Sequence, residues 1–137
     1  MLPAVLDAES YGRESALTCA VTRNRRVLVV DDDRPVRKLM ATMAAGSGYE
    51  TFEAEDGTEA IRVAEAEEID LLITDIEMPG MSGPELIDIL RKRGYLGRSL
   101  LVSGNTAAAS FHNSVPLLAK PFTCGQLLKE IHTILND

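Results

Sequence analysis

The sequence predicts an α/β protein with a doubly wound, five-stranded parallel sheet, and three observations lead to this prediction. Short apolar runs alternate along the chain with longer segments of helical periodicity. The apolar runs are rich in Val, Ile and Leu without polar alternation, as in parallel strands covered on both faces. Several of these runs end in a polar or acidic residue, and parallel sheets bind ligands beyond the carboxyl ends of their strands.

The first half of the chain contributes two predicted strands. Residues 1–24 lack clean periodicity, and we expect an N-terminal extension or linker before a single domain at residues 25–137. Val27–Val30 predicts the first strand, and the helix after it begins near Pro35, which suits a first helical turn. Glu50–Ala54 predicts a weaker second strand.

The next helices begin at recognisable capping signals. Asp56-Gly57-Thr58-Glu59 has the spacing of a capping box with Asp as the cap. Leu71–Thr74 predicts the third strand, which runs into Asp75 and a turn rich in Gly and Pro. Ser82 then caps a third helix, which Gly94 ends.

Two further strands and a last helix complete the predicted sheet. Leu100–Val102 and Pro116–Ala119 are the fourth and fifth predicted strands. Thr123–Gln126 has the pattern of a capping box, and apolar residues follow it at helical spacing. Since the chain ends with this helix, we expect a domain that acts by docking or by passing a group onward, without an output domain after it.

Composition narrows the function classes. The 137 residues fit one domain, and a net charge of −7 argues against a nucleic-acid surface and favours a site built from carboxylates that binds a cation. The two cysteines, Cys19 and Cys124, form neither a disulfide framework nor a metal-ligand spacing. No apolar run approaches the ~20 residues that span a bilayer, and no basic leader is present, so we expect a cytoplasmic protein that binds no membrane.

Polar side chains follow four of the predicted strands: Asp31 and Asp32, Asp75, Ser103, and Lys120. If the first and third strands are neighbours, about 4.8 Å apart, three carboxylates crowd one pocket and oppose one another's ionisation. Mg²⁺ prefers such oxygen ligands and would relieve the repulsion. Lys120 adds a positive charge on the opposite side, and Ser103 adds a hydrogen-bond donor.

This set of groups suits transfer of a phosphoryl group to an aspartate, which forms an acyl phosphate. The transition state needs in-line placement and charge neutralisation rather than covalent help from the protein. Mg²⁺, Lys120 and Ser103 would neutralise or bind the equatorial oxygens. No residue is placed as a strong general base, so the acyl phosphate would persist long enough to carry a signal.

Over roughly residues 25–137, the chain resembles the CheY-like receiver domain of two-component response regulators. Four motifs in the same order carry the resemblance: Val29–Asp33, Asp75–Gly83, Val102–Gly104 and Lys120–Phe122. The resemblance implies a flavodoxin-like fold with strand order 2-1-3-4-5. It also implies phosphoryl transfer from a sensor histidine kinase or a histidine phosphotransfer protein, through phosphohistidine, followed by action on a downstream protein.

Roles for single residues follow from the resemblance. It implies that Asp75 is the phosphoacceptor, that Asp32 binds Mg²⁺ directly, and that Asp31 helps to hold the ion through water. The backbone carbonyl of Glu77 would complete the protein ligands. We further hypothesise that the Glu77 side chain slows loss of the phosphate by crowding and charge, because it lies two residues after Asp75; Asn105 is expected near the same water route.

On the other side of the site, the resemblance makes Ser103 the switch hydroxyl and Gly104 part of the phosphate-binding turn. Lys120 would pair with the phosphate. The Lys120–Pro121 peptide bond is often cis in relatives, and X-Pro bonds have only a small trans preference.

The sequence departs from the family pattern at two places. Relatives usually have Tyr or Phe three residues before the lysine, where this chain has Leu117. Eleven residues from Asn105 to Val115 barely hold an average helix, so we predict that helix 4 is shortened, irregular or absent. Phe111 is a candidate for the missing ring or for plain packing.

Two other functions stay open at this point. Asp31 and Asp33 form a D-x-D after an apolar strand, as in haloacid-dehalogenase-type phosphatases, although Arg34 and Pro35 follow where a small hydroxyl residue is expected. Leu117 and the short link before the fifth strand also allow a binding module that kept the fold and lost signalling.

Overall fold

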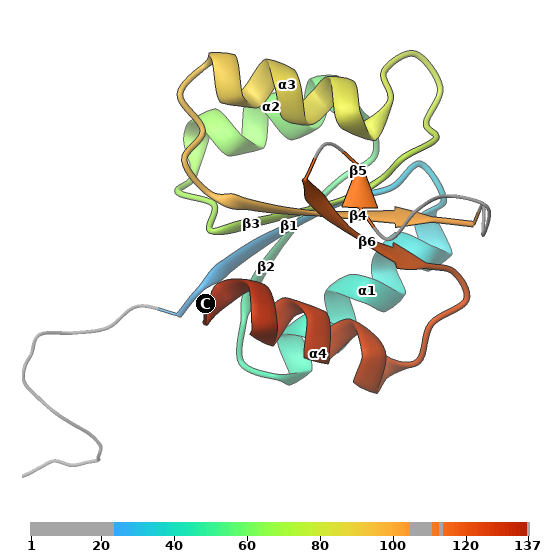
Figure 1. Ribbon diagram of the computed structural model, residues 1–137. Helices are drawn as coiled ribbons and strands as arrows, with labels where there is room; N and C mark the ends of the chain where they lie inside the picture. Colours follow the sequence, from blue (N-terminus) through green and yellow to red (C-terminus); the bar gives the residue numbers. More distant parts are fainter. Residues whose placement is uncertain (1–23, 105–110, 113, 137) are drawn as a thin grey trace, which may run out of the picture.

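The computed structural model describes residues 24–104, 111–112 and 114–136, so the predicted extension lies almost wholly outside the described residues (Figure 1). In chain order the elements are β1 (Arg26–Val30), α1 (Arg34–Gly46), β2 (Glu50–Ala54), α2 (Gly57–Ala66), β3 (Leu71–Asp75), α3 (Gly83–Lys92), β4 (Arg98–Ser103), β5 (Phe111–His112), β6 (Val115–Ala119) and α4 (Cys124–Leu135). Among the described residues, no helix is long and apolar enough to cross a membrane.

One sheet runs through the molecule with the order β2-β1-β3-β4-β6-β5. All strands except β5 are parallel to their neighbours, and the two-residue β5 pairs antiparallel with β6 at the edge. If the short β5 is left out and β6 is counted as the fifth strand, the strand order is 2-1-3-4-5. This order confirms the predicted flavodoxin-like topology. Helices α1 and α4 cover one face of the sheet, and α2 and α3 cover the other (Figure 1).

The central strands are apolar throughout because both of their faces are covered. Val27, Leu28, Val29 and Val30 of β1 are all fully buried. Val27 and Val29 belong to the core under α1 and α4, whereas Leu28 and Val30 belong to the core under α2 and α3. Two separate cores therefore hold β1 rigidly, and the residues after it start from a fixed position.

The helices begin where the capping signals predicted. Ser82 and Thr123 each form a reciprocal capping box, with Glu85 and Gln126 respectively. At α2 only half of the predicted box is present: the Asp56 carboxylate accepts from the Glu59 backbone N–H, but the Glu59 side chain accepts from the backbone N–H of Glu55. The Glu59 carboxylate thus caps the chain one residue earlier than the pattern predicted.

The link between β4 and β6 is strand in its described part, since Phe111–His112 form β5. No helix is present between β4 and β6 among the described residues, in line with the prediction for helix 4. Residues 105–110 and 113 lie outside the described residues. The role predicted for Asn105 and the packing of the Phe111 ring lie outside them as well.

Candidate functional site

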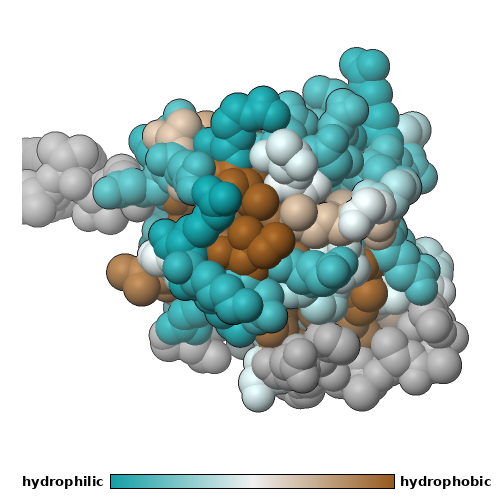
Figure 2. Space-filling view, turned by 90° about the horizontal axis from the view of Figure 1, so that it is seen from above, coloured by the Kyte–Doolittle hydropathy of each residue, from teal (hydrophilic) through white to brown (hydrophobic). Residues whose placement is uncertain are grey.

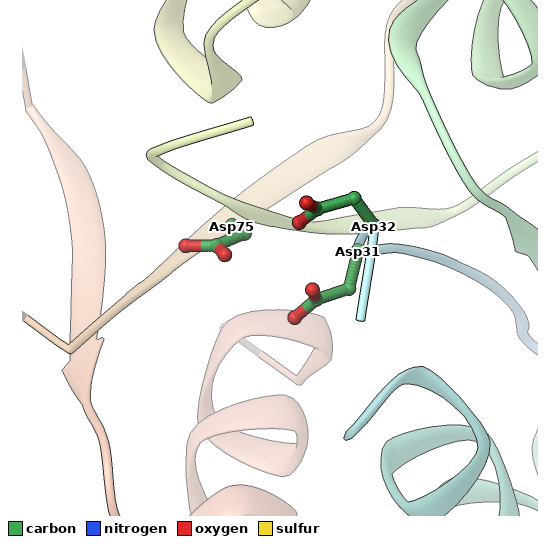
Figure 3. A group of neighbouring side chains, drawn as sticks. All are labelled: Asp31, Asp32 and Asp75. Atoms are coloured by element: carbon green, nitrogen blue, oxygen red, sulfur yellow. The ribbon is translucent and has the colours of Figure 1, made fainter. Parts of the chain in front are cut away.

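Three carboxylates converge at the carboxyl end of the sheet. Asp31 and Asp32 directly follow β1, and Asp75 is the last residue of β3. The register aligns Val30 with Thr74, so the two strand ends lie side by side. Carboxylate oxygens of all three residues lie within 4.8 Å of one another, and Figure 3 shows Asp31 and Asp32 extending from the end of β1 toward Asp75.

Lys120 brings one amine to these carboxylates. Its Nζ lies 3.1 Å from Asp31 Oδ2 and 3.4 Å from Asp75 Oδ2. The backbone N–H of Lys120 donates to the Ser103 carbonyl at 2.7 Å, which fixes the residue after β6 against the end of β4. The Lys120–Pro121 peptide bond is cis. The amine therefore faces the carboxylates, as the strand ends predicted.

Burial and charge oppose each other within this group. Burial raises the pKa of Asp75, and the Asp31 carboxylate adds to this effect while Lys120 works against it. Burial alone would lower the pKa of Lys120, but the hydrogen bond and charge of Asp31, together with the charge of Asp75, raise it. One ammonium group thus faces more negative charge than it balances, which favours binding of a further cation.

Asp31 is the most constrained of the three. It is fully buried; its Oδ1 accepts from the Asp33 backbone N–H at 2.9 Å, and its Oδ2 accepts from Lys120. Arg37 donates to the Asp31 carbonyl at 2.8 Å and also pairs with Glu53. The contact of Arg37 cannot be predicted from the sequence, because helical spacing alone does not show which strand end its side chain reaches.

Ser103 is the last residue of β4 and is 2% exposed. The register aligns Asp75 with Val102, so Ser103 lies one residue beyond the phosphoacceptor candidate on the neighbouring strand. Gly104 is exposed, and a Cβ there would meet no atom within 4 Å. A side chain at position 104 would therefore meet no neighbour among the described residues.

The loop after β3 is held close to Asp75. The Glu77 backbone N–H donates to Asp75 Oδ1 at 3.4 Å, and the Glu77 side chain is exposed. A Cβ at Gly83 would meet the Asp75 carbonyl oxygen, so only glycine lets α3 begin this close to the strand end. In the sequence, Gly83 is recognisable only as part of the Asp75–Gly83 motif, and nothing there predicts this contact.

Leu117 stands where the family pattern described above predicts an aromatic ring. It lies on β6 beside Leu101 and packs, partly buried, against the core under α2 and α3. An aliphatic side chain therefore fills this place.

The donor set at the strand ends fits a small, hard divalent cation. Carboxylate oxygens are the ligands that Mg²⁺ prefers, and it usually takes only one or two of them directly while keeping several waters. Asp32 is exposed and Asp75 only partly buried, which leaves room for such waters. The site therefore fits Mg²⁺ better than a metal that requires nitrogen or sulfur ligands.

Comparison with known proteins gives a consistent result. A family model described as the response regulator receiver domain matches residues 27–132. The CAI-1 autoinducer sensor kinase/phosphatase CqsS of Vibrio cholerae is 36% identical over 74% of this chain and 14% of its own length. Sporulation initiation phosphotransferase F of Bacillus subtilis is 33% identical over 61% of this chain and 65% of its own length. The chain thus spans less than two thirds of these curated relatives.

Solved structures show the same similarity in three dimensions. Chemotaxis protein CheY4 of Vibrio cholerae superposes with a TM-score of 0.77 at 29% identity, covering 82% of this chain and 100% of that one. Response regulator protein TrrA of Thermotoga maritima, in complex with Mg²⁺ and BeF, superposes with a TM-score of 0.73 at 32% identity. The match covers 81% of this chain and 99% of that one.

Proposed function

Because this chain belongs to the response regulator receiver family, whose members accept a phosphoryl group on an aspartate, we propose that Asp75 is the phosphoacceptor. The donor is the phosphohistidine of a sensor histidine kinase or a histidine phosphotransfer protein. The observation that carries this proposal is the convergence of Asp31, Asp32 and Asp75 within 4.8 Å, together with the Lys120 amine.

The chemistry assigns one task to each side chain. A carboxylate oxygen of Asp75 attacks phosphorus, the new O–P bond forms, and the P–N bond breaks with its electron pair leaving on the imidazole nitrogen. Lys120, 3.4 Å from Asp75 Oδ2, neutralises charge on the transferred oxygens. The Ser103 hydroxyl donates to one of these oxygens once the phosphoryl group is in place.

Asp31, Asp32, Asp75 and the backbone carbonyl of Glu77 would hold Mg²⁺. When bound, the ion supplies positive charge that offsets the phosphoryl oxygens. The mutual proximity of the carboxylate oxygens and the raised pKa of Asp75, caused first by burial, support this assignment.

Signalling follows from a change in the partners of Lys120. In the structure its amine is shared between Asp31 and Asp75. A phosphoryl group on Asp75 gives Lys120 and Ser103 new partners, and this differential contact shifts the population toward a second conformation. We propose that a downstream protein in the cytoplasm binds that conformation, and that the net charge of −7 favours a protein partner over nucleic acid.

Phosphorylation with a small donor tests the proposal. The wild-type chain, incubated with Mg²⁺ and acetyl phosphate, is expected to gain one phosphoryl group in an intact-mass spectrum. Asp75→Asn is expected to gain none, whereas Asp88→Asn, which changes an exposed acid on α3, gains as much as wild type. A mass gain that survives Asp75→Asn contradicts the assignment.

The same variants separate the two alternative functions. A haloacid-dehalogenase-type phosphatase with its nucleophile on β1 would keep multiple-turnover activity in Asp75→Asn. The geometry does not favour it, because Asp31 is fully buried, whereas the Asp75 carboxylate is only partly buried. A binding module without signalling would show no change near β4 and β6 on addition of beryllofluoride.

Glu77 provides a test of phosphate lifetime. Its backbone N–H contacts Asp75 at 3.4 Å while its carboxylate is exposed, so the side chain stands near the approach of water to the phosphoryl group. We expect Glu77→Ala to lose phosphate several-fold faster, measured by intact mass after removal of the donor. An unchanged lifetime contradicts this role.

A further inference from the structure

A groove of about 400 Å³ lies between the C-terminal ends of α2 and α3, far from Asp75 at the other end of the sheet. Its lining consists of Ala64, Glu65, Leu90, Arg93, Gly94 and Tyr95. Figure 2, which views the face covered by α2 and α3, shows an apolar patch surrounded by hydrophilic side chains. An apolar centre inside a polar rim is typical of a surface that binds another protein.

Leu96 projects next to this groove. It is 96% exposed, the highest value among the large apolar side chains in the described part of the chain. It borders a second groove of about 700 Å³, and the two grooves adjoin because their linings share Ala64, Glu65, Gly94 and Tyr95.

The turn that carries Leu96 is fixed on both sides. The Tyr95 backbone N–H donates to the Leu90 carbonyl at 2.9 Å, and the Tyr95 hydroxyl donates to the Arg98 carbonyl at 2.7 Å. Gly94 has a φ of 97°, a left-handed conformation that favours glycine. Leu96 is therefore held in the solvent by its surroundings, and the exposure is a feature of the fold.

Charges on the two helix ends are complementary. The end of α2 carries acidic residues and the end of α3 carries basic residues: Glu65, Glu67 and Glu68 against Arg91, Lys92 and Arg93. The helices lie side by side (Figure 1), and Arg93 already pairs with Glu65 within one chain. A half-turn about an axis between the two ends places the basic end of one copy over the acidic end of another.

We propose that this surface, the α2–α3 end face, binds a second copy of the chain in a two-fold symmetric dimer. Leu96 of each copy enters the groove of its partner, and Lys92 of each copy faces Glu68 of its partner. The α2–α3 end face carries the projecting Leu96, the groove that receives it, and both the basic Lys92 and the acidic Glu68. It is therefore self-complementary, as a two-fold interface requires. The inference does not rest on the proposed function, since no residue of the Asp75 site takes part.

Sedimentation velocity of the full chain between about 10 and 300 µM tests the dimer, since transient interfaces bind in this range. We expect wild type and Asp75→Asn to move from monomer to dimer as concentration rises. Leu96→Asp is expected to weaken the dimer at least about tenfold. The matched control Leu39→Asp, which changes a 53% exposed leucine of α1 on the opposite face, is expected to behave as wild type.

A charge exchange tests the geometry. Lys92→Glu alone and Glu68→Lys alone each put like charges opposite one another twice, and each is expected to weaken the dimer. An equimolar mixture of the two variants restores opposite charges at both contacts, and so it is expected to dimerise nearly as well as wild type. Circular dichroism checks that every variant is folded.

Three results overturn the proposal: a wild-type chain that stays monomeric at 300 µM, a dimer unaffected by Leu96→Asp, or a mixture that dimerises no better than its components.

Discussion

The two ends of the sheet differ in how well their acidic and basic side chains balance each other. At the carboxyl end, Asp31, Asp32 and Asp75 face the single amine of Lys120. At the amino end, acids and bases match more evenly: Arg26 pairs with Glu50 and Glu67, and Arg93 pairs with Glu65.

This difference indicates that electrostatic repulsion destabilises the fold mainly at the carboxyl end of the sheet. Buried like charges destabilise a folded chain unless something binds to them. The side chains of the amino-end pairs are between 25% and 53% exposed, and pairs that solvent reaches in this way contribute little in either direction. An imbalance confined to one end, beside buried Asp31, is therefore typical of a binding site rather than of general surface charge.

The largest effect is expected from removal of the amine. Lys120→Met leaves fully buried Asp31 without its 3.1 Å partner and Asp75 without its 3.4 Å partner. We expect a loss of about 3 kcal/mol in the free energy of unfolding without Mg²⁺, at the lower end of the range for fully buried pairs, because Lys120 is 23% exposed. Urea denaturation in EDTA measures it; a loss below about 1 kcal/mol would show that the ends differ less than proposed.

A gain in stability is expected when one negative charge is removed from the same end. The pKa of Asp75 is raised above its usual 3.8, mainly by burial. The folded chain therefore binds this proton more tightly than the unfolded chain, so stability falls as pH rises through 3.8 toward the raised pKa, and the cost is fully present at pH 7.

Asp75→Asn removes this cost and leaves Lys120 paired with Asp31. We expect the variant to be more stable than wild type at pH 7 without Mg²⁺, by about 1 kcal/mol. The gain should shrink as pH is lowered through the raised pKa of Asp75 toward 3.8, because the wild-type carboxyl then gains its proton. Denaturation at several pH values measures this; a variant less stable than wild type at pH 7 contradicts the account.

The smallest effect is expected at the amino end. Glu65→Gln removes one partner of the Arg93–Glu65 pair, whose side chains are 53% and 51% exposed. We expect a change below about 0.5 kcal/mol in the free energy of unfolding, because solvent and salt screen exposed pairs. Denaturation at low micromolar concentration measures it on the monomer. A change as large as that of Lys120→Met would remove the contrast between the two ends.

Most of the carboxyl end could be predicted from sequence because a general rule applies to it. Parallel strands end at one edge, so residues directly after them, such as Asp31, Asp75 and Lys120, come together whatever the helices do. Capping signals at Ser82 and Thr123 are equally local.

The features that were missed depend on tertiary packing. Arg37 reaches Asp31 only through the angle at which α1 packs, and Gly83 matters only because α3 begins against β3. The two-residue β5 is too short to show a period. The exposure of Leu96 beside a groove follows from the tertiary structure, because nothing in the local sequence marks this leucine.

Thermal unfolding of wild type and Asp32→Asn, each with and without millimolar Mg²⁺, tests the central claim most directly, namely that the unbalanced charge at the carboxyl end is a cation site. Binding to the folded state alone raises the melting temperature, and we expect Mg²⁺ to raise that of wild type by about 2–4 °C. Asp32→Asn should show less than half of this increase. A wild-type melting temperature that does not respond to Mg²⁺, or an equal response in Asp32→Asn, contradicts the claim.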